Sequence, residues 1–75
     1  MAAEMLEMRF KRDGYTREEW AAFVDPTDGA ALRAALLSAV AREGWPDPER
    51  ILPHCVLIWR RQRGGGGWTR FTAAR

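Results

Sequence analysis

The segment from Cys55 to Phe71 constrains the fold most, because its composition changes twice over a short distance. It begins with five apolar residues, becomes basic, passes through four glycines at 64–67, and ends with aromatic and basic residues. Alternate residues of a strand point to opposite faces, so residues 55–59 place apolar side chains on both faces. Such a strand is central in a sheet or covered on both sides. The segment therefore predicts a β-hairpin with strands over 54–63 and 68–73.

The distal part of this hairpin is cationic and cannot be buried without partners. With the turn centred in the glycine tract, Arg63 lies opposite Trp68, and Arg61 lies opposite Arg70. That register places Trp68 beside arginines on one face. Trp and Arg are the residue types enriched at interaction hot spots. The predicted partner-binding residues are Arg60, Arg61, Arg63, Trp68 and Arg70.

The first third of the chain predicts a strand followed by a short helix. Apolar and charged residues alternate over 6–11, which is the period of a half-buried strand, and Asp13-Gly14 predicts a turn after it. Thr16 stands three residues before Glu19, the spacing of a capping box, and apolar residues follow at helical spacing. We therefore expect a helix over 17–24, ending before Pro26.

A second and longer helix is expected after Asp28, which is a suitable N-terminal cap. Leucine, alanine and valine residues at helical spacing form one apolar stripe, and Gly44 suits the left-handed position that ends a helix. Residues 48–52 allow at most one further helical turn, because Pro48 and Pro53 bound it. The order β-α-α-(short helical turn)-β-β predicts an α+β fold, a small two-layer domain with helices packed on an antiparallel sheet.

The chain length predicts a single domain over 1–75 with a small core. One core at this length rarely supplies more than about 3–5 kcal/mol of stability. Docking on a partner, or association into a homodimer, is therefore a physically motivated expectation. No apolar stretch approaches the ~20 residues of a membrane helix, and the first residues lack a signal-type pattern. Cys55 is the only cysteine, so no intrachain disulfide can form. We expect a cytoplasmic protein without a membrane partner.

The sequence offers no convincing catalytic or metal-binding set. His54 and Cys55 are adjacent, but neighbouring strand residues face opposite ways, and one pair is too few for zinc. The aspartates and glutamates are better explained as helix caps, turn residues and solvent-exposed side chains. The glycine tract lies between two strands, whereas phosphate-binding loops precede a helix. We therefore expect a non-enzymatic protein without a cofactor.

The charge distribution leaves two classes of binding partner. Residues 1–43 carry six basic and eight acidic side chains, whereas residues 44–75 carry six and two. Arginines with interleaved aromatics suit nucleic acid, and helices followed by a basic hairpin resemble a winged helix. However, the segment at the position of a recognition helix, 48–52, is short and poor in basic residues. The acidic N-terminal half would also repel phosphate.

These observations place protein docking ahead of nucleic-acid binding. The sequence predicts a small binding protein that docks on a protein or ribonucleoprotein, such as an adaptor, an immunity or antitoxin-type protein, or a phage-type inhibitor that acts by occlusion. The alternative is a winged-helix-like domain that binds nucleic acid through the arginine and tryptophan hairpin.

Overall fold

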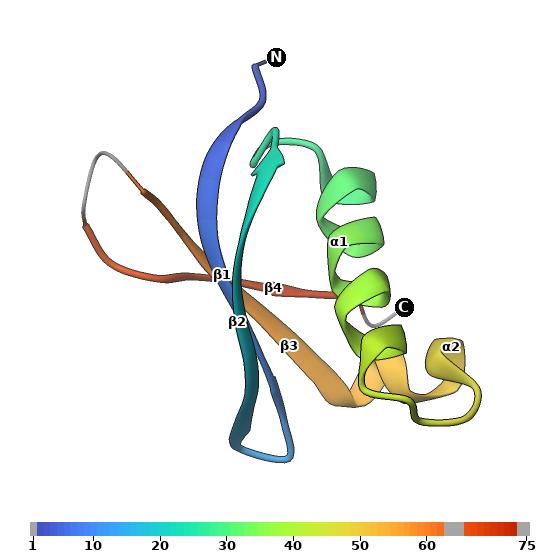
Figure 1. The fold of residues 1–75 in the computed structure, drawn as a ribbon. Helices are drawn as coiled ribbons and strands as arrows, with labels where there is room; N and C mark the ends of the chain where they lie inside the picture. Colours follow the sequence, from blue (N-terminus) through green and yellow to red (C-terminus); the bar gives the residue numbers. More distant parts are fainter. Residues whose placement is uncertain (1, 63–65, 74–75) are drawn as a thin grey trace.

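The computed structural model describes residues 2–62 and 66–73, which form a four-stranded antiparallel sheet with helices on one face (Figure 1). The strands are β1 (Glu4–Arg12), β2 (Tyr15–Val24), β3 (Cys55–Arg61) and β4 (Thr69–Thr72). The helices are α1 (Gly29–Arg42) and α2 (Pro48–Ile51), and a 3-10 turn, Leu52–His54, joins α2 to β3. The predicted α+β class with helices on a small antiparallel sheet is confirmed.

The order of elements differs from the prediction at one place, because residues 17–24 belong to strand β2 and not to a helix. Asp13 and Gly14 both have positive φ, 54° and 84°, as a two-residue hairpin turn of type I′ requires. This turn sends the chain straight back along β1. Half-buried residues then alternate with exposed ones from Glu18 to Val24, which is the period of a strand. The capping-box spacing of Thr16 and Glu19 was therefore misleading.

The strand order is β2-β1-β3-β4, so β3 lies inside the sheet, as its apolar character predicted. In the β3–β4 pair, Ile58 lies opposite Arg70 and Trp59 lies opposite Thr69. The predicted pairing of Arg61 with Arg70 was therefore wrong. The strands are shorter than expected, since β3 ends at Arg61 and β4 begins at Thr69. The other predicted pair involved Arg63, which lies outside the described residues.

The core lies between α1 and one face of the sheet. This face carries the alternating apolar residues of β1 and β3, and α1 contributes one stripe of its surface. Among the described residues, the buried apolar ones are Leu6, Met8, Phe10, Leu32, Leu36, Ala39, Val40, Leu52, Cys55, Leu57, Ile58 and Trp59. Of these, Ile58 points away from α1, because it neighbours Leu57 and Trp59 along β3.

Both ends of α1 follow the sequence signals. The side chain of Asp28 accepts hydrogen bonds from the backbone N–H groups of Ala30 and Ala31, at 3.1 and 3.2 Å. At the other end, Gly44 has a φ of 84°, and its N–H donates to the carbonyl oxygen of Ala41. Trp45 then packs edge-on against Phe10, with ring centroids 6.2 Å apart. The cap and the following tryptophan therefore fix α1 against β1.

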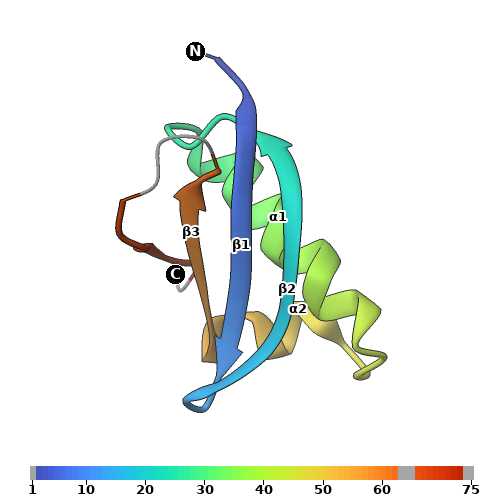
Figure 2. The ribbon, with the colours of Figure 1, turned by 60° about the vertical axis from the view of Figure 1, so that its left-hand side comes forward.

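The two helices lie on the same side of the sheet, and within residues 2–62 and 66–73 no helix covers the other side (Figures 1 and 2). Among the helices of these two ranges, none is long and apolar enough to cross a membrane. We call the side of the sheet away from α1 the open face. Its side chains are the ones that the fold leaves available for contact with other molecules.

Candidate binding surface

The open face is defined by the alternation of side chains along the four strands. Residues that lie opposite one another in an antiparallel pair share a face, so the registers assign each residue to one side. The open face carries Met5, Glu7, Arg9, Lys11, Thr16, Glu19, Ala21, Phe23, Val56, Ile58, Arg60, Arg70 and Thr72. It therefore combines ionic residues with apolar ones.

Trp68 lies against the centre of this face. The guanidinium carbons of Arg9 in β1 and Arg60 in β3 both lie 4.5 Å from the centroid of its ring. Each cation–π contact contributes about 0.5–1 kcal/mol at a partly exposed site. The indole is half-buried. Two neighbouring strands therefore position Trp68, although it precedes β4 in the chain.

Two carboxylates hold these arginines in place. Arg60 Nε donates to Glu7 Oε1 at 2.8 Å, and Glu7 lies directly opposite Arg60 in the sheet. Arg9 Nε lies 3.4 Å from Glu19 Oε2, which is an ion pair but not a well-aligned hydrogen bond. This buried N–H has no hydrogen-bond acceptor within the described part of the chain. The centre of the open face is thus a network of alternating charges beneath one aromatic ring.

The two ends of the open face differ in chemistry. At one end Met5 and Phe23 lie opposite each other, with 43% and 70% of their surfaces exposed. At the other end is Lys11, whereas Arg70 lies on β4 in the same row as Ile58 and Arg9. Neither Lys11 nor Arg70 forms an ion pair with any described residue. An exposed aromatic residue, a positioned tryptophan and an unpaired arginine resemble the composition of interaction hot spots.

The structure brings together three of the five residues that the sequence singled out. Arg60, Trp68 and Arg70 belong to the open face. Arg61 points to the opposite side, where its Nε donates to Glu4 Oε1 at 3.0 Å. Arg63 lies outside the described residues. The predicted cluster is therefore divided between two faces of the sheet.

Sequence reasoning did not single out most of this surface, including Glu7, Arg9, Glu19 and Phe23. Arg9 and Glu7 could have been found, because the alternation over 6–11 already assigns them to the polar side of a strand. Glu19 and Phe23 could not be placed there while residues 17–24 were predicted to be helical. Only the strand β2 brings them beside β1.

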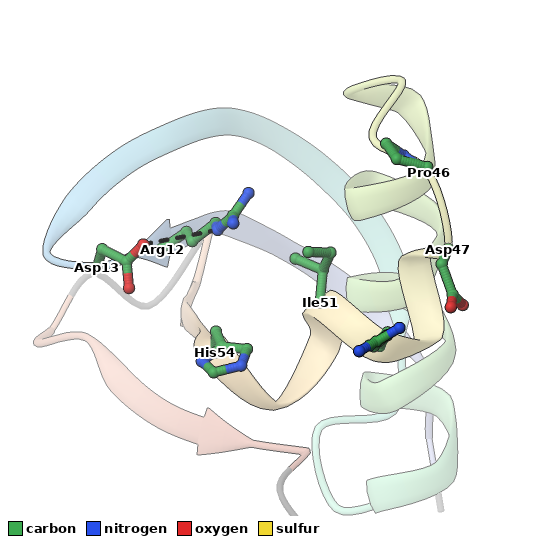
Figure 3. Close-up of a pocket in the computed structure, with 7 residues that line it drawn as sticks. Arg12, Asp13, Pro46, Asp47, Ile51 and His54 are labelled. Atoms are coloured by element: carbon green, nitrogen blue, oxygen red, sulfur yellow. Dashed lines mark ion pairs between the residues drawn. The ribbon is translucent and has the colours of Figure 1, made fainter.

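Apart from the open face, the molecule has a hollow where the β1–β2 turn approaches α2 (Figure 3). Its volume is about 530 Å³. Arg12 is stacked over Trp45 at 4.4 Å and lies 3.6 Å from the Asp13 carboxylate. Asp47 has a left-handed φ of 57° and forms no side-chain cap to α2. The lining residues are Arg12, Asp13, Pro46, Asp47, Arg50, Ile51 and His54, so the lining includes two arginines and two aspartates.

Cys55 and His54 do not form a reactive pair. Cys55 is 1% exposed, and its thiol donates to the carbonyl oxygen of Ile51 at 3.6 Å. Burial raises the pKa of the Cys55 thiol, so the thiol stays protonated and is a poor nucleophile at neutral pH. His54 is exposed. Across residues 2–62 and 66–73, no three histidine, cysteine or acidic side chains gather as metal ligands would.

A scan against models of protein families finds no match to this chain, and searches of curated proteins and of solved structures also find none. The function must therefore be inferred from the geometry of the molecule itself.

Proposed function

We propose that this protein is a non-enzymatic binding protein that docks on a protein or ribonucleoprotein partner through its open face. The main support is the position of Trp68, which lies against β1 and β3 over Arg9 and Arg60. An aromatic side chain fixed in this way loses little conformational entropy on binding. Exposed Phe23 adds a second apolar anchor on the same face. Such a protein would serve as an adaptor, or as an inhibitor that acts by occlusion.

The charges of the open face favour a protein partner over nucleic acid. Two arginines of the hairpin are already paired, Arg60 with Glu7 and Arg61 with Glu4. Glu7 and Glu19 also lie on the open face, where they would repel phosphate groups. A mixture of both charges around an aromatic centre suits a protein surface with complementary charges. Nucleic acid remains the alternative ligand, and a salt titration separates the two.

Substitution of Trp68 tests the proposal. The tagged protein is used to capture partners from an extract of its native host, in parallel with Trp68→Ala and Arg70→Glu. We expect both variants to lose the captured protein, with an affinity loss of at least about 30-fold for Trp68→Ala, as for a hot-spot residue worth 2 kcal/mol. The matched control is Arg50→Glu, which makes the same charge change on α2, away from the open face.

The outcomes separate the candidate functions. A partner that all three variants retain equally would contradict docking through the open face. A partner lost on nuclease treatment, together with binding to oligonucleotides that weakens steeply with added salt, would replace protein docking by nucleic-acid binding. Circular dichroism spectra and melting temperatures close to those of the wild type show that the variants remain folded.

A further inference from the structure

Strand β2 presents a long unpaired edge. The strand order β2-β1-β3-β4 makes β2 the outermost strand, and it has ten residues, whereas the opposite edge strand β4 has four. Exposed edges invite pairing with another strand, and proteins usually protect them with charges, proline or a bulge. Such protection is uneven here: Arg17, Glu18 and Glu19 lie in the first half of β2, next to a register irregularity between Phe10 and Lys11. The second half is unprotected.

The unprotected half of this edge is complementary to itself. Residues 20–24 read Trp-Ala-Ala-Phe-Val and contain no charge, proline or glycine. If two copies pair antiparallel about Ala22, Trp20 lies opposite Val24 of the second copy, and Ala21 lies opposite its Phe23. Each large side chain then meets a smaller one on the same face of the sheet. All five apolar residues pair only with one another.

Other registers of the two paired β2 strands are less favourable. A shift of two residues toward the N-terminus would place Glu18 and Glu19 opposite Val24 and Phe23 of the second copy, which would desolvate two carboxylates. In the register about Ala22, Glu19 faces Asp25 of the second copy beyond the paired segment. Both carboxylates already have partners, because Glu19 pairs with Arg9 and Asp25 accepts hydrogen bonds from Thr27.

The flank of α1 on the same side is compatible with a second copy. Arg42 lies on this flank, since it reaches Glu18 of β2 at 2.6 Å. Helical spacing places Ala31, Ala35 and Ser38 on the same flank as Arg42. These three small side chains leave room for the second α1 to approach. The long side chain on this flank is that of Arg42, which lies over Glu18 and Trp20.

The size of the chain also favours a second copy. Its accessible surface is 4672 Å², so a standard interface of about 800 Å² per partner would cover roughly one sixth of it. Symmetric pairs are the commonest protein oligomers, and each contact of their interface occurs twice. A small core gains most from such burial.

We propose that two copies of this protein associate through their β2 edges, antiparallel and centred on Ala22, into one continuous eight-stranded sheet. The two open faces then lie on the same side of this sheet. Each dimer therefore presents two Trp68 sites to a partner. This association is formed by the backbone edge of β2, and of the open face only Ala21 and Phe23 take part in it. Self-association of the purified protein is measured without a docking partner, so it can hold or fail independently of the proposed docking.

The mass in solution tests the dimer. Sedimentation equilibrium over a concentration series is expected to give 17 kDa, twice the 8.5 kDa of the chain. Phe23→Lys should weaken the dimer at least about tenfold, because the substitution acts twice across the two-fold axis. The matched control is Tyr15→Lys: Tyr15 and Phe23 are equally exposed, at 70%, but Tyr15 lies outside the paired segment. A monomer at every concentration, or equal effects of the two substitutions, would overturn the proposal.

The register is tested by cysteine crosslinking in a Cys55→Ala background. Ala22→Cys should form a disulfide-linked dimer on mild oxidation, because directly opposed Cβ atoms lie about 4.5–5.5 Å apart. Ala21→Cys should not, since residues offset by two positions are about 7–8 Å apart. The reverse result would refute the register centred on Ala22.

Discussion

The roles of single residues in this protein depend on their neighbours in space and not on their neighbours in the sequence. Trp68 follows the glycine tract in the chain, but it lies against Arg9 and Arg60 from two other strands. Arg60 and Arg61 are neighbours in sequence and point to opposite faces, each toward its own glutamate. A basic cluster in the sequence is thus two separate ion pairs in the fold.

Cys55 carries the clearest dependence on pH. Burial raises the pKa of its thiol above the ordinary value of 9.0. The folded state therefore holds the proton more tightly than the unfolded state, and this contribution to stability is complete below pH 9.0. It is lost as the pH rises through the pKa of the folded protein.

We expect the free energy of unfolding of the wild type to fall above pH 9.0 more steeply than that of Cys55→Ala. Urea denaturation at a series of pH values measures this difference. Parallel pH profiles for the two proteins would show that the thiol does not titrate in this way.

At the scale of elements, β2 is the most instructive segment. Its sequence has the capping-box spacing of a helix, whereas its side chains alternate between half-buried and exposed as those of a strand do. The type I′ turn at Asp13 and Gly14 decides between them, because it places residues 15–24 beside β1. Backbone pairing with β1 then outweighs the local helix signal. Local propensity of this kind is weak and tertiary context overrides it.

Helix α1 should stabilise the sheet mainly through one stripe of side chains. Leu36 is fully buried under the sheet, whereas its neighbour Leu37 is only partly buried. Leu36→Ala should cost about 2–5 kcal/mol, because it removes buried methyl groups and leaves a cavity. Leu37→Ala should cost about 1 kcal/mol. Chemical denaturation of the two variants measures the difference, and equal losses would mean that α1 packs in another orientation.

At the scale of the whole molecule, the domain is asymmetric. Helices cover one face of the sheet, and the other face and the β2 edge stay accessible. The open face combines Trp68 with ion pairs, and the edge carries the apolar segment 20–24. These two surfaces suit two different kinds of contact.

If the β2 edges pair, folding and association are linked. The melting temperature should then rise with protein concentration, because a second copy that binds only the folded state stabilises it. Phe23→Lys should shift this concentration dependence to higher protein concentrations, while Tyr15→Lys should leave it unchanged. Differential scanning calorimetry at several protein concentrations provides the measurement. A melting temperature independent of concentration in the wild type would contradict the linkage.

The sequence by itself determined the features that depend on neighbouring residues. The alternation over 6–11, the cap at Asp28 and the end of α1 at Gly44 all rest on local backbone geometry, and the structure has each of them. The apolar run 55–59 likewise predicted an inner strand. Each of these signals is strong because it needs only a few adjacent residues.

Tertiary structure decided what depends on residues far apart in the chain. It made residues 15–24 a strand, set the register of β4 against β3, and brought Arg9 and Glu19 to the surface that holds Trp68. These choices follow from the pairing of whole strands and from burial against α1. Which strands pair, and in which register, depends on contacts across the entire sheet, so local propensity alone cannot predict it.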